Sequence, residues 1–153
     1  MLHTHPDTQN QLISILGDHI RDVILRKVRS SLCYTVIADE VTDCSNKEQL
    51  SIVLRYIESE TSFIREDLVT FLECDSGTTG EALADQILTF VKNHLDPSKM
   101  RGQAYDGVSN MSGKTSGTAA RISFIYPLAL YTQCAFHSLN LAVVASFQGV
   151  CVT

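Results

Sequence analysis

The segment Met100–Gly113, MRGQAYDGVSNMSG, combines residue types that suit a ligand-binding turn. A short β-type run leads to Asp106, and small polar residues that include Asn110 follow it. Gly107 and Gly113 let the backbone approach a ligand closely and adopt conformations that other residues avoid. Because α/β folds bind ligands beyond the carboxyl ends of their strands, we expect the carboxylate of Asp106 to lie in a binding site, surrounded by these turn residues.

One carboxylate does little chemistry alone, so the elements around Asp106 must supply a partner. Apolar periodicity and turn signals divide the chain into helices and strands in the order α-β-β-β-α-β-α-β-α. Asp7 or Thr8 is expected to cap the first helix. Thr78 is expected to cap the second, with Glu81 in a capping box. The expected helices span 9–30, 78–95, 115–124 and 137–147, and the expected strands span 32–38, 49–57, 63–72, 100–104 and 128–134.

The lengths of the connections predict how these strands pair. Short connections join the first three strands into an antiparallel meander, so the third strand is parallel to the first. A right-handed crossover through the second helix then lays the fourth strand parallel to the first. The first strand becomes central in a mixed sheet of about five strands. Asp39, which ends this strand, is therefore expected to lie beside Asp106.

Two aspartates that converge at strand ends have three possible roles. A general acid and base would suit hydrolysis of a sugar bond, although nothing else in the sequence resembles a sugar-binding cleft. Carboxylate oxygens also suit one or two Mg²⁺ ions, which stabilise the attacking and leaving oxygens in phosphoryl transfer. In the third reading, Asp39 merely caps a turn and Asp106 forms an Asx-turn. The residue pattern alone leaves the three readings open.

The composition is that of an ordinary globular domain without a basic surface. The 153 residues are 44% hydrophobic and 19% charged, which is enough for one domain with its own core. The formal net charge is −5 and the basic residues are scattered, so contact with DNA would need other modules or metal ions. No apolar run is long enough to span a membrane, and the N-terminus has no secretory signal. The five cysteines, an odd number without C-x-x-C spacing, suit reduced thiols in the nucleus or cytoplasm.

Two further motifs resemble known sites but depart from them. The residues GKT at 113–115 look like the end of a phosphate-binding P-loop, but the first glycine of that loop would fall at Val108. We therefore expect no bound nucleotide. Cys134 and His137 have C-x-x-H spacing, but the sequence has no second pair to complete four zinc ligands. We therefore expect no zinc.

Four segments, in order, closely resemble hAT-superfamily transposases, and most nearly the transposase-derived proteins related to zinc finger MYM-type protein 1. The segments are IADEVTDCSNKEQLSIVLRYI (37–57), TTGEALADQIL (78–88), RGQAYDGVSNMSGKTSGTAARI (101–122) and CAFHSLNLAV (134–143). The resemblance implies a ribonuclease-H-like α/β fold that is incomplete at its C-terminus. On this reading 1–8 is a polar lead-in and 9–153 is a partial catalytic domain.

The resemblance also implies roles for individual residues. The family uses three acids to hold two divalent metal ions, Mg²⁺ or Mn²⁺, during DNA cleavage and strand transfer. Asp39 matches the first of these acids and Asp106 the second. Cys134 and His137 match an accessory C-x-x-H motif near the catalytic pocket. The third acid is a Glu far downstream, which this chain does not contain.

The function that we expect follows from this incomplete set. It is a transposase-derived domain related to magnesium-dependent DNA cleavage and strand transfer, inactive alone because the third acid is missing. DNA contact is expected through a longer protein in the nucleus, since the family's zinc-finger and dimerisation regions are also absent. The alternative is a domesticated or truncated remnant that acts as a protein-interaction module without catalysis. Ala104 and Ser138 depart from the Gly and Arg that are common in the family.

Overall fold

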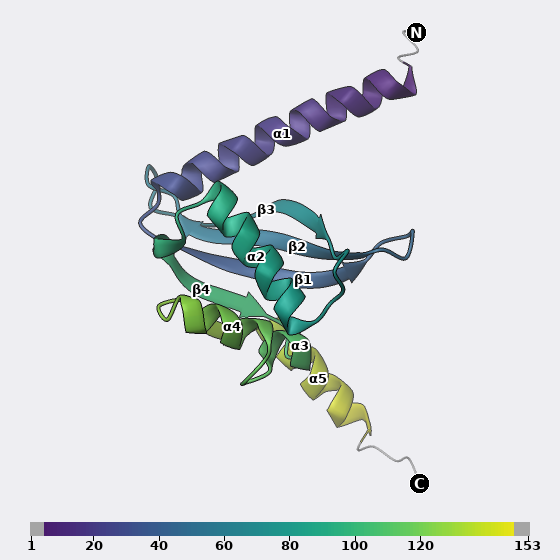
Figure 1. Cartoon of the computed structure of the whole chain (residues 1–153), viewed down its shortest axis with the longest axis vertical. Helices are drawn as coiled ribbons and strands as arrows, with labels where there is room; N and C mark the ends of the chain where they lie inside the picture. Colours follow the sequence, from purple (N-terminus) through teal and green to yellow (C-terminus); the bar gives the residue numbers. More distant parts are fainter. Residues whose placement is uncertain (1–4, 149–153) are drawn as a thin grey trace.

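Five strands and their helices account for nearly all of the chain (Figure 1). A computed structural model describes residues 5–148, so the outer ends of the expected segments, 1–4 and 149–153, lie outside the described residues. The helices are α1 (Pro6–Ser30), α2 (Gly80–His94), the 3₁₀ turn η1 (Pro97–Lys99), α3 (Ser109–Ser112), α4 (Thr118–Ile125) and α5 (Ala135–Gln148). The strands are β1 (Tyr34–Thr42), β2 (Glu48–Ile57), β3 (Ile64–Glu73), β4 (Met100–Tyr105) and β5 (Leu130–Gln133).

The sheet has the predicted order, with β1 in the centre. Its strands run β3-β2-β1-β4-β5 across the sheet. β1 and β2 pair antiparallel, as do β2 and β3, while β1 with β4 and β4 with β5 pair parallel. The prediction of an α/β fold with a mixed five-stranded sheet is therefore confirmed.

One face of the sheet forms the core with α2, which crosses it in Figure 1. Alternate residues of β1 and β2 point to this face, as the two-residue period of a strand requires. The buried strand residues are Tyr34, Val36, Ala38, Leu50, Ile52, Leu54 and Tyr56, and α2 buries Leu83, Ile87 and Val91 against them. Burying each Leu or Ile side chain contributes about 1.5–3 kcal/mol. This packing fixes β1, which is the strand that carries Asp39.

Several expected boundaries are wrong by a few residues. α1 begins at Pro6 rather than at residue 9, and His5 rather than Asp7 or Thr8 is its N-cap. Thr79, not Thr78, caps α2, because its hydroxyl accepts the N–H of Ala82 at 3.2 Å. This one-residue shift takes Glu81 out of the capping-box position.

The boundaries near the candidate site also move. β1 continues to Thr42, four residues past its expected end, because β2 still pairs with it there. α4 begins at Thr118 rather than at residue 115, and one helical turn, α3, forms inside the expected site turn. α5 begins at Ala135, two residues before the expected start.

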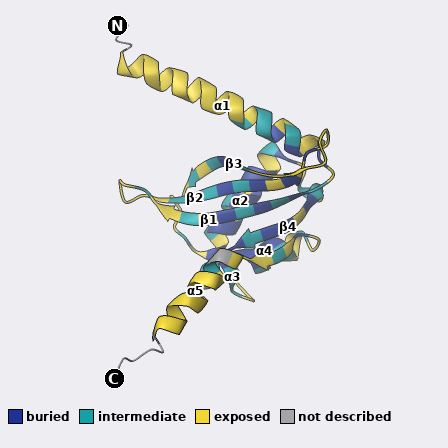
Figure 2. Cartoon of the chain, turned by 180° about the vertical axis from the view of Figure 1, so that it is seen from behind, coloured by how far each residue is buried: buried dark blue, intermediate teal, exposed yellow. Residues whose placement is uncertain are grey.

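Only the C-terminal end of α1 is covered by the rest of the domain. Leu25 and Val28 are buried, whereas Ile13 and Leu16 are 67% and 60% exposed. The N-terminal half of α1 projects away from the sheet, and α5 projects from the other end of the domain (Figures 1 and 2). Among the described residues, no helix is both long enough and apolar enough to cross a membrane.

Candidate active site

A cavity of about 440 Å³ lies where β4 ends, between β1 and the start of α5. Nine residues line it: Ile37, Ala38, Asp39, Ala104, Tyr105, Asp106, Cys134, His137 and Asn140. All four residues for which the sequence predicted a catalytic or accessory role are in this set. In Figure 1, α3 and α5 both lie at the end of β4.

The sheet register brings Asp39 and Asp106 to neighbouring strands, although the ladder between β1 and β4 ends before it reaches them. Ile37 of β1 pairs with Ala104 of β4, and two residues further along each chain lie Asp39 and Asp106. Asp39 was expected to end its strand. It does not, because it still pairs with Ser51 of β2. The hydroxyl of Ser51 also donates to the carbonyl oxygen of Asp39 at 3.0 Å. Asp39 is therefore held by the sheet itself, whereas Asp106 lies just beyond it.

Local hydrogen bonds position Asp106 in the turn after β4. Its Oδ1 accepts the backbone N–H of Val108 at 3.3 Å, which is an Asx-turn. Its carbonyl oxygen accepts the hydroxyl of Tyr131 from β5 at 3.2 Å. One carboxylate oxygen of Asp106 is thus used structurally, as the third reading of the sequence allowed. The side chain still lines the cavity opposite Asp39.

Cys134 and His137 enter the cavity because β5 turns directly into α5. The N–H of Cys134 donates to the carbonyl oxygen of Tyr105 at 2.9 Å, which ties the start of α5 to the end of β4. The carbonyl oxygen of Cys134 then accepts the N–H of Ser138 at 3.2 Å in the first turn of the helix. Cys134 and His137 are both half-buried, and their spacing places them on the same side of this turn.

The cavity concentrates negative charge. Burial raises the pKa of Asp39, and the nearby carboxylate of Asp106 raises it further. The N–H of Glu40 and the ring of His137 act in the opposite direction on this pKa. Burial also raises the pKa of Glu40, although a hydrogen bond from Asn110 opposes that shift. Two like charges that disfavour each other are the arrangement that a bound cation would relieve.

The predicted turn residues divide into two groups. Gly107 borders the cavity, since a Cβ added there would lie 2.5 Å from Nε2 of Gln133 and 3.8 Å from Cδ2 of His137. Asn110 and Gly113 do not line it. Gly113 is the C-cap of α3, and the Asn110 side chain donates to Glu40. None of the three turn residues therefore lines the cavity: Gly107 lies beside it, and Asn110 and Gly113 support the turn.

Sequence reasoning missed two polar residues at the site. Asn140 lines the cavity one helical turn after His137, and a three-residue spacing on a helix was a signal that could have found it. Glu40 lies on the opposite face of β1 from Asp39 and interacts electrostatically with both Asp39 and Asp106. Its contact with Asn110, 70 residues away, leaves no mark in the sequence.

The donors in the cavity fit a hard divalent cation in part. Mg²⁺ prefers carboxylate oxygens and keeps several waters, so Asp39 and Asp106 would suffice to hold one. Among the described residues, no group of three or more His, Cys, Asp or Glu side chains could hold a metal ion together. The cavity therefore offers two carboxylates that could bind a cation.

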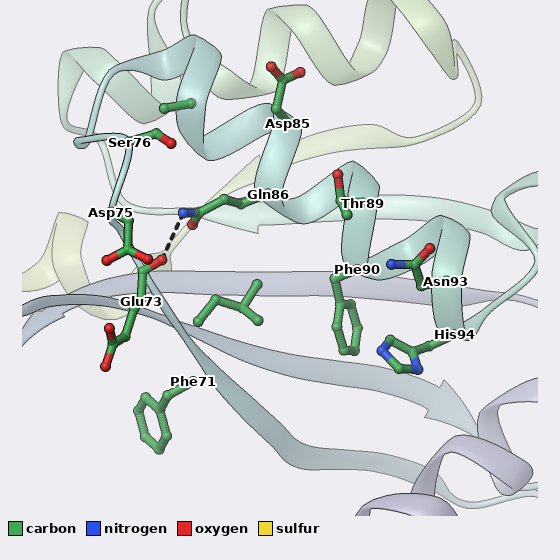
Figure 3. A pocket seen from close by; sticks show the side chains of 12 residues that line it. Phe71, Glu73, Asp75, Ser76, Asp85, Gln86, Thr89, Phe90, Asn93 and His94 are labelled. Atoms are coloured by element: carbon green, nitrogen blue, oxygen red, sulfur yellow. Dashed lines mark hydrogen bonds between the residues drawn. The ribbon is translucent and has the colours of Figure 1, made fainter.

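A larger hollow of about 540 Å³ lies elsewhere, between β3 and α2 (Figure 3). It contains none of the predicted site residues. Gln86 crosses it, donating from Nε2 to the carbonyl oxygen of Glu73 at 2.9 Å. Its carboxylates come from Glu73, Asp75 and Asp85, and Glu73 is already paired with Lys47 at 3.0 Å. Size therefore does not single out the chemical site.

The five-stranded mixed sheet and the two aspartates at neighbouring strands define a ribonuclease-like α/β domain. Residues 1–117 match the family described as DUF4371, the ZMYM1/FAM200 RNase-like domain. The chain belongs to this family. The resemblance to transposase-derived proteins related to zinc finger MYM-type protein 1 is thereby confirmed.

The chain is also similar to named proteins and to solved structures. The chain is 34% identical over 135 residues to the human "52 kDa repressor of the inhibitor of the protein kinase", and 34% identical over 134 residues to its mouse counterpart. These matches cover 87% and 86% of the chain but only 17% of each relative. A crystal structure of human endonuclease V covers 84% of the chain and 66% of its own length, with 12% identity and a TM-score of 0.39.

Proposed function

We propose that this domain retains half of a transposase-type metal centre of the hAT superfamily, in which Asp39 and Asp106 hold a divalent cation, Mg²⁺ or Mn²⁺. The observation that carries the proposal is that both carboxylates line one cavity, in which burial raises the pKa of Asp39 and repulsion by Asp106 raises it further. A bound cation would remove that repulsion. Family membership supports the same assignment, since these two residues match the first two acids of the transposases that the sequence resembles.

Four residues of the cavity have distinct parts in this proposal. A divalent cation, when bound, supplies Lewis-acid stabilisation of charge on a phosphate oxygen. Asp39 binds it from the rigid centre of the sheet, and Asp106 binds it through the carboxylate oxygen that the Asx-turn leaves free. His137 and Asn140, from the first turns of α5, face the same space and would contact a phosphate or orient the acids.

We infer that this chain alone cleaves DNA poorly or not at all. A third carboxylate is needed to hold the second metal ion and to offset charge in the transition state. DNA contact, Mg²⁺-dependent strand transfer and a nuclear location would belong to a longer protein. The chain's 17% share of its relatives' length fits this inference.

The second candidate function is that of a protein-interaction module without catalysis. Two observations favour it: the exposed apolar residues on α1 and α5, and the word "repressor" in the name of the relatives. Large exposed apolar patches are typical of interaction surfaces. This candidate predicts no specific metal binding in the cavity.

Thermal unfolding in the presence of Mn²⁺ tests the proposal. At a concentration about 100 times the Kd, a ligand that binds only the folded state adds about 2.7 kcal/mol of stability. For a domain of this size we expect the melting temperature to rise by about 5–10 °C. Asp39→Asn and Asp106→Asn should each lose the rise, while Asp85→Asn, on the exposed side of α2, should keep it. A wild-type chain that unfolds cooperatively without responding to Mn²⁺ would contradict the proposal.

A further inference from the structure

The sheet leaves the position of Asp106 relative to Asp39 undetermined. The last β1–β4 pair is Ile37 with Ala104, and beyond it the two chains are no longer joined by the ladder. β1 continues as a partner of β2, whereas the chain after Tyr105 leaves the sheet and enters the turn with α3. Because metal-binding carboxylates must be held within a fraction of an ångström, something else must connect this turn to β1.

The side chain of Asn110 makes that connection. Its Nδ2 donates to Oε1 of Glu40 at 2.7 Å and to the carbonyl oxygen of Thr78 at 2.9 Å. Its Oδ1 lies 3.0 Å from the backbone N–H of Met111, which donates to it. Both amide donors and the acceptor are thus engaged, with one bond to the residue that follows Asp39 on β1. Asn110 therefore joins three segments: the site turn, β1 and the start of α2.

Backbone packing holds Asn110 in place from behind. The hydroxyl of Thr118, at the start of α4, donates to the carbonyl oxygens of Asn110 and Gly80 at 3.2 Å. A Cβ added to Gly80 would lie 2.7 Å from the carbonyl oxygen of Asn110, so the start of α2 contacts this turn backbone to backbone. These contacts hold the turn against α2 and α4. The hydrogen bond from the Asn110 amide to Glu40 then connects the turn to β1.

We propose that Asn110 and Glu40 are positioning residues that set the separation of Asp39 and Asp106 for cation binding. Glu40 itself does not line the cavity and would not contact the cation. Its carboxylate accepts a hydrogen bond from the Asn110 amide, and this bond fixes the turn relative to β1. This inference rests on the proposed metal site, and it assigns to the turn residue Asn110 a role that is mechanical rather than ligating.

The test is the Mn²⁺ dissociation constant, measured by isothermal titration below the onset of unfolding. Loss of an outer-shell partner typically weakens metal affinity 10- to 100-fold. We expect Asn110→Asp to weaken Mn²⁺ binding at least 10-fold, because it places a carboxylate against Glu40. Glu40→Ala should have a similar effect. Glu40→Gln keeps an acceptor oxygen for the Asn110 amide, so it should weaken binding less than Glu40→Ala.

The double variant Asn110→Asp with Glu40→Gln separates positioning from general loss of structure. It reverses the direction of the bond, since the new amide at 40 donates to the new carboxylate at 110. We expect it to recover at least half of the lost binding free energy, although the bond to Thr78 stays broken. The matched control is Gln86→Ala, which removes a comparable side-chain bond between α2 and β3, remote from the cavity. It should lower the melting temperature but leave the Mn²⁺ affinity unchanged.

The outcomes distinguish this inference from the function on which it rests. If the wild type binds no Mn²⁺, or if Asp39→Asn binds it equally well, the metal site itself is wrong and the inference falls with it. If both aspartates are required but Asn110→Asp binds Mn²⁺ as tightly as the wild type, only the positioning role is overturned. The same holds if the double variant binds no better than Asn110→Asp alone.

Discussion

At the scale of single residues, the carboxylate of Asp39, which we propose as a cation ligand, lowers the stability of the metal-free domain when it is ionised. The carboxylate of Asp39 is partly withdrawn from water and faces Asp106, and both effects raise its pKa above the usual 3.8. Between that value and the raised pKa, the folded protein holds more protons than the unfolded chain. Stability from this group therefore falls as the pH rises through the interval, and above it the ionised side chain is a cost.

Asp39→Asn should accordingly stabilise the metal-free domain. Repulsion between partly exposed charges contributes up to about 1 kcal/mol, so we expect the melting temperature at neutral pH to rise by about 1–3 °C. The gain should shrink as the pH is lowered through the raised pKa of Asp39, because the carboxyl group of the wild type is then protonated as well. Calorimetry across this pH range measures the difference. An Asn variant that is less stable than the wild type at neutral pH would show that the carboxylate makes favourable contacts instead.

The convergence of Asp39 and Asp106 was predictable because it follows from topology. Connection lengths decide which strands pair, and the handedness of the crossover decides where β4 lies. The bond between Asn110 and Glu40 was not predictable in this way. It depends on side-chain directions at two positions that no local pattern links, and only the packed structure brings them to 2.7 Å.

At the scale of elements, the sequence predicted the type of each helix and strand better than its ends. Thr78 and Thr79 are both good N-cap residues, and only the path of the chain into α2 decides that Thr79 is used. Apolar periodicity predicted the helix α1 correctly. Periodicity does not reveal whether another element covers a helix, however, and in this domain only the C-terminal end of α1 is covered, at Leu25 and Val28.

The contact between α2 and the site turn gives a prediction at this scale. In Gly80→Ala the new methyl group would lie 2.6 Å from the carbonyl oxygen of Ser116, a backbone atom that cannot move away alone. We expect a loss of about 1–3 kcal/mol in the free energy of unfolding, measured by urea denaturation.

Gly107→Ala is the matched control for this prediction. Its methyl group would lie 2.5 Å from Nε2 of Gln133, the end of an exposed and flexible side chain, while Cδ2 of His137 lies at 3.8 Å, an ordinary contact distance. It should therefore cost less than about 1 kcal/mol. Equal losses of unfolding free energy in the two variants would mean that α2 and the turn are packed less closely than the structure indicates.

At the scale of the whole molecule, the chain combines one packed core with two projecting helices. Leu139 on α5 is 60% exposed and Ile13 on α1 is 67% exposed, at opposite ends of the domain (Figure 2). Exposed apolar surface of this extent is typical of regions that pack against other protein. From α1 the core takes Leu25 and Val28, near the C-terminal end of that helix. From α5 the cavity takes His137 and Asn140, in the first turns of that helix.

The molecule has more than one hollow, and the central claim is that the cavity lined by Asp39 and Asp106 binds the cation. The larger hollow, between β3 and α2, has carboxylates too, so binding of Mn²⁺ somewhere on the chain does not locate the site. Broadening of backbone amide signals by substoichiometric Mn²⁺ in two-dimensional NMR does locate it. We predict that the signals of Asp39, of 106–108 and of 134–137 disappear first, while those of 73–76 persist. Selective loss of the signals of 73–76, or uniform weak broadening over the whole chain, would contradict the claim.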